Sequence, residues 1–162
     1  MIIEWILRGA TENDQPYWYA SMTKSANEIE AMISSVLDNL DLVQTLTDSV
    51  TAFMKFDEDT AHWIGMSVRE AVTNAIQHGN KLDPGKKVEI CYGMTPERLT
   101  VSIRDQGDGF QADKIPDPLD GDNLLKPSGR GIFYMRSFMD EVDFRLMVNG
   151  GTEVYMTKIL KN

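Results

Sequence analysis

The sequence contains one cysteine, two histidines and no long apolar run. Cys91 alone cannot form an internal disulfide or a cysteine-rich metal site, which favours a reducing, cytoplasmic setting. The first ten residues, MIIEWILRGA, carry no basic leader and are too few to span a bilayer, so we expect neither a signal peptide nor a membrane anchor. The chain also shows no internal repeat and no low-complexity tract.

Basic residues are scarce as well, with 16 Lys and Arg against 25 Asp and Glu and a formal net charge of −9. Surfaces that bind nucleic acid or anionic membranes rely on clustered Lys and Arg, so we expect neither kind of partner. An anionic ligand must therefore be held by a local arrangement of groups within this acidic chain.

The length of 162 residues and the apolar composition of 42% suit one sizeable core and are short for two. We therefore expect a single domain over residues 17–162. Residues 1–16 end in the turn-like stretch TENDQP and are expected to form an extension of that domain.

The first part of the domain is expected to be a strand followed by helices. Tyr17 to Met22 has the aromatic content of a strand, and Ser25 can cap a helix that runs to about Asn39. The apolar stripe of this helix would consist of Ile29, Met32, Ile33, Val36, Leu37 and Leu40. A second helical pattern covers Leu42 to Phe56, and a third begins behind a cap at Asp57 or Asp59.

The rest of the domain alternates between apolar and polar residues, which is typical of half-buried strands. One hairpin is expected over 88–92 and 99–103, and a second over 142–148 and 152–160, with a short helix at about 130–138 between them. This order of elements predicts an α/β fold. We expect a two-layer sandwich whose mixed, largely antiparallel sheet is covered by helices on one face.

The third helix, from about Thr60 to His78, carries a polar stripe within the segment REAVTNAIQHGN. Glu70, Asn74 and His78 recur every four residues and therefore lie on one side of the helix. The opposite side is apolar and would pack on the sheet through Ile64, Val68, Ala71, Val72, Ala75 and Ile76. Such a stripe can hold a divalent cation and offer a carboxylate as a base, although an ordinary solvated helix face carries the same residue types.

Two glycine-containing segments follow. In RDQGDGF, Asp105 stands where a strand ends, and Gly107 and Gly109 let the backbone approach a flat ligand closely. A buried carboxylate there can accept a hydrogen bond from an exocyclic amine such as that of adenine, and a plain Asp-Gly turn is the alternative. In PSGRGIFYMRSFMDEV, Gly129 and Gly131 come just before an apolar helix, where free backbone N–H groups suit phosphate oxygens.

The loop from Gln111 to Ser128 joins these two segments and has no apolar periodicity. A long loop bounded by glycines beside a nucleotide pocket is typical of a lid, and a loop without function is the competing interpretation. The stretch from Asn123 to Met139 contains Lys126, Arg130 and Arg136 and no acidic residue, which supports phosphate contact near Arg130.

The order of these motifs is E-x-x-x-N-A-x-x-H-G, D-x-G-x-G, a lid, and G-x-G before a helix. It resembles the Bergerat-type ATP-binding fold of gyrase, Hsp90, histidine kinases and MutL proteins. Within that superfamily, REAVTNAIQHGN, the short lid and SFMDEV most resemble the bacterial anti-sigma factor serine/threonine kinases. The resemblance covers about residues 17–160.

The resemblance implies ATP and Mg²⁺ as cofactors, with Asn74 as a metal ligand and Glu70 as the base that faces the γ-phosphate. It implies that Asp105 binds the adenine amine and that Gly107 and Gly109 shape the base pocket. Further nucleotide contacts are implied for His78, Gly79, Phe110, Lys126, Ser128, Gly129, Arg130, Gly131 and Ile132. Family members bind a sigma factor, phosphorylate a STAS-type antagonist protein and are often homodimers.

Two other functions remain open from the sequence. The first is a non-catalytic, ATP-gated module that binds a protein partner, against which the intact Glu70 argues. The second is a histidine-kinase catalytic domain detached from its sensor. Since His62 and His78 are the only histidines and His78 lies inside the ATP motif, such a domain would have to act on another chain.

Overall fold

The computed structural model describes residues 27–108, 127–147 and 150–161, and of 127–130 it describes the backbone alone. The strand predicted at Tyr17–Met22 and the boundary between the extension and the domain lie outside these residues.

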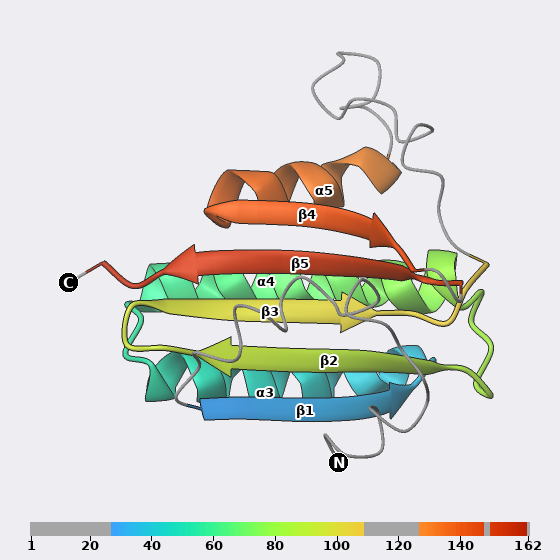
Figure 1. The fold of residues 1–162 in the computed structure, drawn as a ribbon, viewed down its shortest axis with the longest axis horizontal. Coiled ribbons are helices and arrows are strands. Elements are labelled where there is room, and N and C mark those ends of the chain that lie inside the picture. The colour runs from blue at the N-terminus through green and yellow to red at the C-terminus, as the bar shows by residue number, and fades with distance from the viewer. Residues whose placement is uncertain (1–26, 109–126, 148–149, 162) are drawn as a thin grey trace.

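The sheet contains five strands in the order β1-β2-β3-β5-β4 (Figure 1). Each neighbouring pair is antiparallel, which agrees with the predicted, largely antiparallel sheet, and the described strands include no parallel pair. The strands are β1 (Asn27–Ser34), β2 (Lys87–Met94), β3 (Arg98–Arg104), β4 (Glu141–Leu146) and β5 (Thr152–Ile159). Both predicted hairpins, β2 with β3 and β4 with β5, are confirmed.

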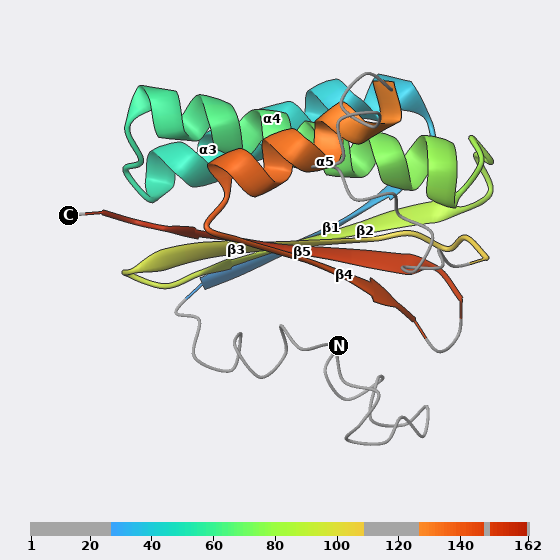
Figure 2. The ribbon, with the colours of Figure 1, turned by 90° about the horizontal axis from the view of Figure 1, so that it is seen from above.

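Three helices lie side by side on one face of the sheet, which confirms the two-layer α/β architecture (Figure 2). They are α3 (Leu40–Phe53), α4 (Glu58–Asn74) and α5 (Pro127–Phe138). A 3-10 turn, Leu37–Asn39, precedes α3, and a π-helical turn, Ala75–Gly79, continues α4.

The prediction of a helix from Ser25 to Asn39 is wrong, because residues 27–34 form the edge strand β1. Ile29, Ala31 and Ile33 pair with apolar residues of β2 and share their face, whereas Glu28 and Glu30 point to the other side. In this segment the apolar residues satisfy the helical spacing and the alternation of a strand equally well. Pairing with β2 at eight positions stabilises the strand over the helix.

The helix carrying the polar stripe begins where the sequence predicts. Asp57 caps α4, since its Oδ1 accepts a hydrogen bond from the backbone N–H of Thr60 at 2.9 Å. Bonds to Thr60 lower the pKa of the Asp57 carboxyl. The six residues predicted to pack on the sheet are all buried: Ile64, Val68, Ala71, Val72, Ala75 and Ile76. The opposite side of α4 is therefore left for polar groups.

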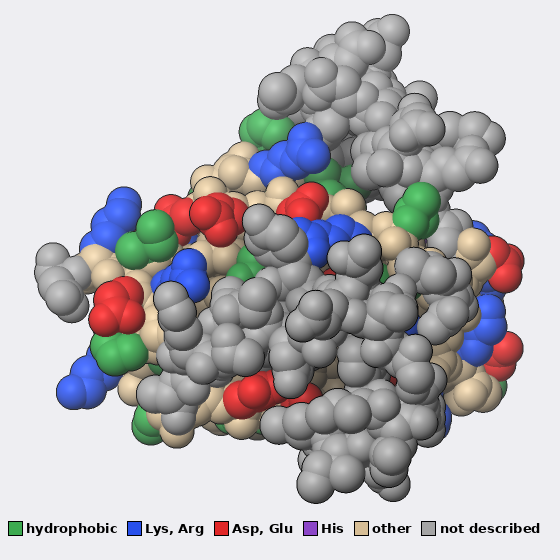
Figure 3. Space-filling view, viewed as in Figure 1, with side chains coloured by type: hydrophobic (Ala, Val, Ile, Leu, Met, Phe, Trp, Pro, Cys, Tyr) green, Lys and Arg blue, Asp and Glu red, His purple; other side chains and the backbone are tan. Residues whose placement is uncertain are grey.

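The core fills the space between helices and sheet and includes the alternating residues of β2, β3 and β5. On the side of the molecule shown in Figure 3, acidic and basic side chains of the described residues are interspersed. Among the described helices, none has the length and apolar character that crossing a membrane requires.

Candidate functional site

The polar stripe emerges at the C-terminal end of α4. Glu70 and Asn74 are half-buried, and neither side chain forms a hydrogen bond with the described residues. Burial raises the pKa of Glu70, and the nearby His78 imidazole lowers it by a smaller amount. A carboxylate with a raised pKa and no fixed partner is suited to accept a proton from a bound group.

His78 does not share the half-buried setting of the other two residues. The π-helical turn Ala75–Gly79 adds a residue to the last turn, and its closing bond runs from Asn80 N to Ala75 O at 2.8 Å. As a result His78 is exposed. The structure thus brings Glu70 and Asn74 together, with His78 nearby at the surface.

Helix α5 packs against α4 so closely that Gly131 touches the side chain of Glu70. A Cβ at position 131 would overlap the Glu70 carboxylate, so glycine allows this approach without moving the Glu70 side chain. Two turns away, Trp63 and Phe138 stack with ring centroids 3.6 Å apart and an interplanar angle of 6°. Because Gly131 meets Glu70 and Phe138 meets Trp63, the two helices run antiparallel.

The first turn of α5 differs slightly from the prediction. The helix begins at Pro127, so Gly129 and Arg130 lie inside its first turn and not before it. The N–H groups of a first turn still lack partners within the helix, so the expected anion-binding end is preserved. Gly109, Phe110 and Lys126 lie outside the described residues, and of Ser128, Gly129 and Arg130 only the backbone is described.

Asp105 ends β3 in a fixed orientation and is only 5% exposed. Its Oδ1 accepts hydrogen bonds from Gly107 N at 2.9 Å and from Thr152 N at 3.1 Å. Burial raises the pKa of this carboxyl, and the two backbone N–H groups partly offset that rise. With the described residues, Oδ2 forms no hydrogen bond, and it is therefore the oxygen available to a ligand.

Three glycines surround Asp105. A Cβ on Gly79 would overlap the Asp105 carboxylate, and a Cβ on Gly107 would overlap the carbonyl of Gly79. Gly151, with φ of +91°, lies against the Asp105 carbonyl. The motif at the end of α4, the end of β3 and the β4–β5 turn therefore meet at one point, where the absence of side chains on the glycines lets these segments pack closely around Asp105.

Two of the residues at this point were missed by sequence reasoning. Gly151 was expected only as part of a hairpin turn. Asn80 follows Gly79 and was expected only to end a helix, yet its side chain is fully buried and hydrogen-bonded. Its partners are distant in sequence, so no local pattern could have indicated them.

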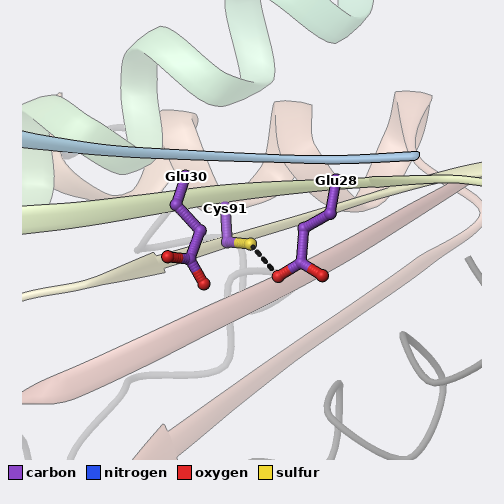
Figure 4. A group of neighbouring side chains, drawn as sticks. All are labelled: Glu28, Glu30 and Cys91. Carbon is purple, nitrogen blue, oxygen red and sulfur yellow. Dashed lines mark hydrogen bonds between the residues drawn. The ribbon is translucent and has the colours of Figure 1, made fainter. Parts of the chain in front are cut away.

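A second cluster of possible metal ligands lies on the sheet face away from the helices (Figure 4). The ligand atoms of Glu28, Glu30 and Cys91 lie within 4.8 Å of one another, and the Cys91 thiol donates to Glu28 Oε1 at 3.5 Å. Burial, followed by the nearby acids, raises the pKa of the Cys91 thiol far above its ordinary value. Because the helices that carry Glu70 and Gly131 cover the opposite face of the sheet, this cluster stands apart from the site.

Comparison with known families agrees with this geometry. A family model described as "Histidine kinase-like ATPase domain" matches residues 33–158. The serine-protein kinase RsbW of Bacillus subtilis is 30% identical over 145 residues, covering 86% of this chain and 89% of the relative. The anti-sigma F factor of Oceanobacillus iheyensis is 33% identical over 136 residues, covering 83% of this chain and 93% of the relative.

A solved structure shares the fold. A crystal structure of the RsbU and RsbW domains of Rv1364c from Mycobacterium tuberculosis superimposes with a TM-score of 0.58 at 16% identity. The match covers 85% of this chain and 34% of that longer one, so this chain spans about a third of it.

Proposed function

Because the chain belongs to the family of histidine kinase-like ATPase domains, we propose that it is an ATP-dependent protein serine/threonine kinase of the anti-sigma factor type. The observation that carries this proposal is the contact of Gly79 with Asp105. It joins the segment that bears Glu70 and Asn74 to the segment that bears Asp105, so that one ligand can reach both.

The residues fit ATP. Asp105 Oδ2 would accept the adenine amine, and the glycines packed around Asp105 hold that carboxylate in place. The N-terminal turn of α5 lies near Glu70, since Gly131 contacts that side chain, and its free N–H groups would receive phosphate oxygens. The adenine and the phosphates would thus be held by different elements of the fold.

The residues also fit Mg²⁺, which prefers oxygen ligands and retains several waters. The Asn74 side chain offers an amide oxygen without a hydrogen-bonded partner among the described residues, one helical turn from Glu70. When bound there, the ion would neutralise charge on the phosphates.

In the proposed transfer, the hydroxyl oxygen of a serine or threonine on the partner attacks the γ-phosphorus. The new oxygen–phosphorus bond forms as the bond to the β-phosphate oxygen breaks, and ADP leaves. Glu70 accepts the hydroxyl proton, a role that its raised pKa supports, together with the lack of a hydrogen-bonded partner among the described residues. Asp105 takes no part in the chemistry and acts only on the affinity for ATP.

As the partner we propose a STAS-type antagonist protein, which the chain would phosphorylate, and a sigma factor, which it would bind as a homodimer in the cytoplasm. The names of the two bacterial relatives, a serine-protein kinase and an anti-sigma F factor, support partners of this kind. The site itself does not depend on which of these proteins occupies the surface around it.

The test compares Glu70→Gln with the wild type. The glutamine keeps the size of the side chain that packs on Gly131, so ATP affinity should stay within about twofold, whereas transfer should fall by about 100-fold or more. Radiolabelled ATP and a purified STAS-domain protein from the same organism supply the assay, and calorimetry supplies the affinity. Glu58→Gln removes an exposed carboxylate from the same helix and serves as the matched control.

The outcomes separate the competing functions. Full transfer by the glutamine variant would remove Glu70 from the role of base. ATP-dependent complex formation without any phosphoserine would favour a non-catalytic, ATP-gated module. Phosphorylation of a histidine on a second chain would favour a detached histidine-kinase domain.

A further inference from the structure

We propose that Asn80 is a positioning residue that fixes the adenine-binding carboxylate of Asp105 against the end of the α4 segment. This inference rests on the proposed function, because it takes Asp105 as the group that binds the adenine amine. Asn80 itself is fully buried and would touch neither the nucleotide nor the metal.

The Asn80 amide joins three segments of the fold. Its Nδ2 donates to Ser35 Oγ, just after β1, at 2.6 Å and to the Lys87 carbonyl, at the start of β2, at 2.8 Å. Its Oδ1 accepts from the backbone N–H of Gln106 at 2.7 Å. A carbonyl can only accept and a backbone N–H can only donate, so these partners fix the orientation of the amide.

The third of these bonds reaches Asp105 directly. Gln106 N belongs to the peptide that follows Asp105, so the bond from Asn80 fixes the plane in which the chain leaves that residue. The Gln106 side chain is tied to the same place, since its Oε1 accepts from Lys87 N at 2.8 Å. Consecutive residues thus make a two-point attachment, with Gly79 against Asp105 and Asn80 against Gln106.

The backbone after Asn80 needs such an anchor. Lys81 and Leu82 have φ of 58° and 59°, a conformation that is unfavourable for residues with a side chain. The turn is closed by bonds from Leu82 N to Ile76 O and from Asp83 N to Asn80 O. A strained turn persists only where its surroundings hold it, and the three bonds of Asn80 provide that hold.

The consequence is specific to the base pocket. The bonds from Gly107 and Thr152 hold the Asp105 carboxylate to its own loop and to β5, and the bond from Asn80 to Gln106 holds that loop against the α4 segment. Without the bond to Gln106, the carboxylate would be placed less precisely relative to Gly79, and the hydrogen bond to the adenine amine would weaken. The phosphate contacts proposed for the first turn of α5 lie beside Glu70 and Gly131 and would persist, because the side-chain bonds of Asn80 reach Ser35, Lys87 and Gln106 instead. Asn80 would therefore act on recognition of the amine more than on affinity for the triphosphate.

The experiment measures that recognition by calorimetry with two probes, Mg-ATP and the Mg complex of purine riboside triphosphate, which lacks the amine. Wild type should prefer ATP by about tenfold or more, the value of one hydrogen bond to a charged group. Asn80→Ala should reduce this preference to about twofold or less. A residue with a merely structural role would weaken both ligands alike and leave the ratio unchanged.

Two further variants complete the design. Ser35→Ala breaks one buried bond of the same network but leaves the bond to Gln106, so it should keep the wild-type ratio. Asn80→Asp retains an acceptor for Gln106 N and should keep more of the ratio than the alanine variant. It also preserves the test if Asn80→Ala does not fold, because a folded aspartate variant without the preference would overturn the inference.

The failures are distinguishable. Wild type that does not bind ATP, or does not prefer it over the analogue, would overturn the assignment of Asp105 within the proposed function. Wild type that prefers ATP while Asn80→Ala prefers it equally would overturn only the positioning role of Asn80.

Discussion

The two ends of the candidate site are built differently. At the Asp105 end, formed by Asp105, Gly107 and Thr152, backbone N–H groups hold one carboxylate oxygen and packing glycines surround it. At the Glu70 end, formed by Glu70 and Asn74, neither side chain has a hydrogen bond among the described residues. We therefore propose that the first end is assembled before any ligand arrives and that the ligand completes the second.

This difference matches the demands of the two tasks. Recognition of a base gains from groups that are already oriented, because no ordering cost is then incurred on binding. Proton transfer and metal binding need groups whose lone pairs are available, because a carboxylate saturated by protein donors is a weaker base.

Among the tests of how the two ends differ, we expect the largest effect when Asp105 is replaced by asparagine. The new amide oxygen can still accept from Gly107 and Thr152, but an NH₂ group stands in place of Oδ2 and cannot accept from an amine. We expect ATP affinity to fall by about 30- to 100-fold, measured by calorimetry, with transfer at saturating ATP close to that of the wild type. Asp108→Asn, an exposed neighbour, is the control and should retain wild-type affinity.

A second test disturbs the packing of the Asp105 end. In Gly79→Ala the new Cβ overlaps the Asp105 carboxylate, so either that side chain or the turn must move. We expect a loss of about 1–3 kcal/mol in the free energy of unfolding, together with weaker ATP binding, in urea denaturation and calorimetry. Gly85→Ala is the matched control. Its Cβ would lie 3.1 Å from Asp83 Oδ1 in an exposed turn, and it should change stability by only about 0.5 kcal/mol.

A third test sharpens the description of the Glu70 end through pH. Because burial disfavours the ionised carboxylate, the pKa of Glu70 in the folded protein is above 4.5. Protonated Glu70 therefore contributes stability that is fully present below the unfolded pKa and is lost as the pH rises through the folded pKa. Glu70→Gln lacks this titration and should melt about 1–3 °C above wild type near pH 8. The gap should close toward pH 4.5, and a gap that widens on acidification would contradict the raised pKa.

Local pattern was sufficient for much of the fold and for the Glu70 end. The cap at Asp57, the helix it begins and the two hairpins follow from residue types within a few positions of one another. Glu70 and Asn74 lie together because the helical repeat places them so. Strand β1 escaped detection because its apolar residues satisfy two periods, and only its partner β2, about 60 residues later, distinguishes them.

The interior of the Asp105 end could not be predicted from local pattern. The bonds of Asn80 to Ser35 and Gln106 span 45 and 26 residues, and no sequence pattern near Asn80 predicts them. That Gly79 and Asp105 belong to one nucleotide site was implied only by resemblance to a family whose motifs occur in this order, and their direct contact was not predicted. Contacts between distant segments require the folded chain, and they are what turns separate motifs into one site.

In the π-helical turn Ala75–Gly79, the number of residues affects the geometry of the site. Five residues span a turn that an α-helix would complete with four, and the extra one brings Gly79, and not its neighbour, under Asp105. Deletion of the exposed Gln77 would remove no functional group, yet it would rotate Gly79 by about 100° away from the carboxylate. In this turn, the number of residues between α4 and Gly79 matters for the site as much as their side chains do.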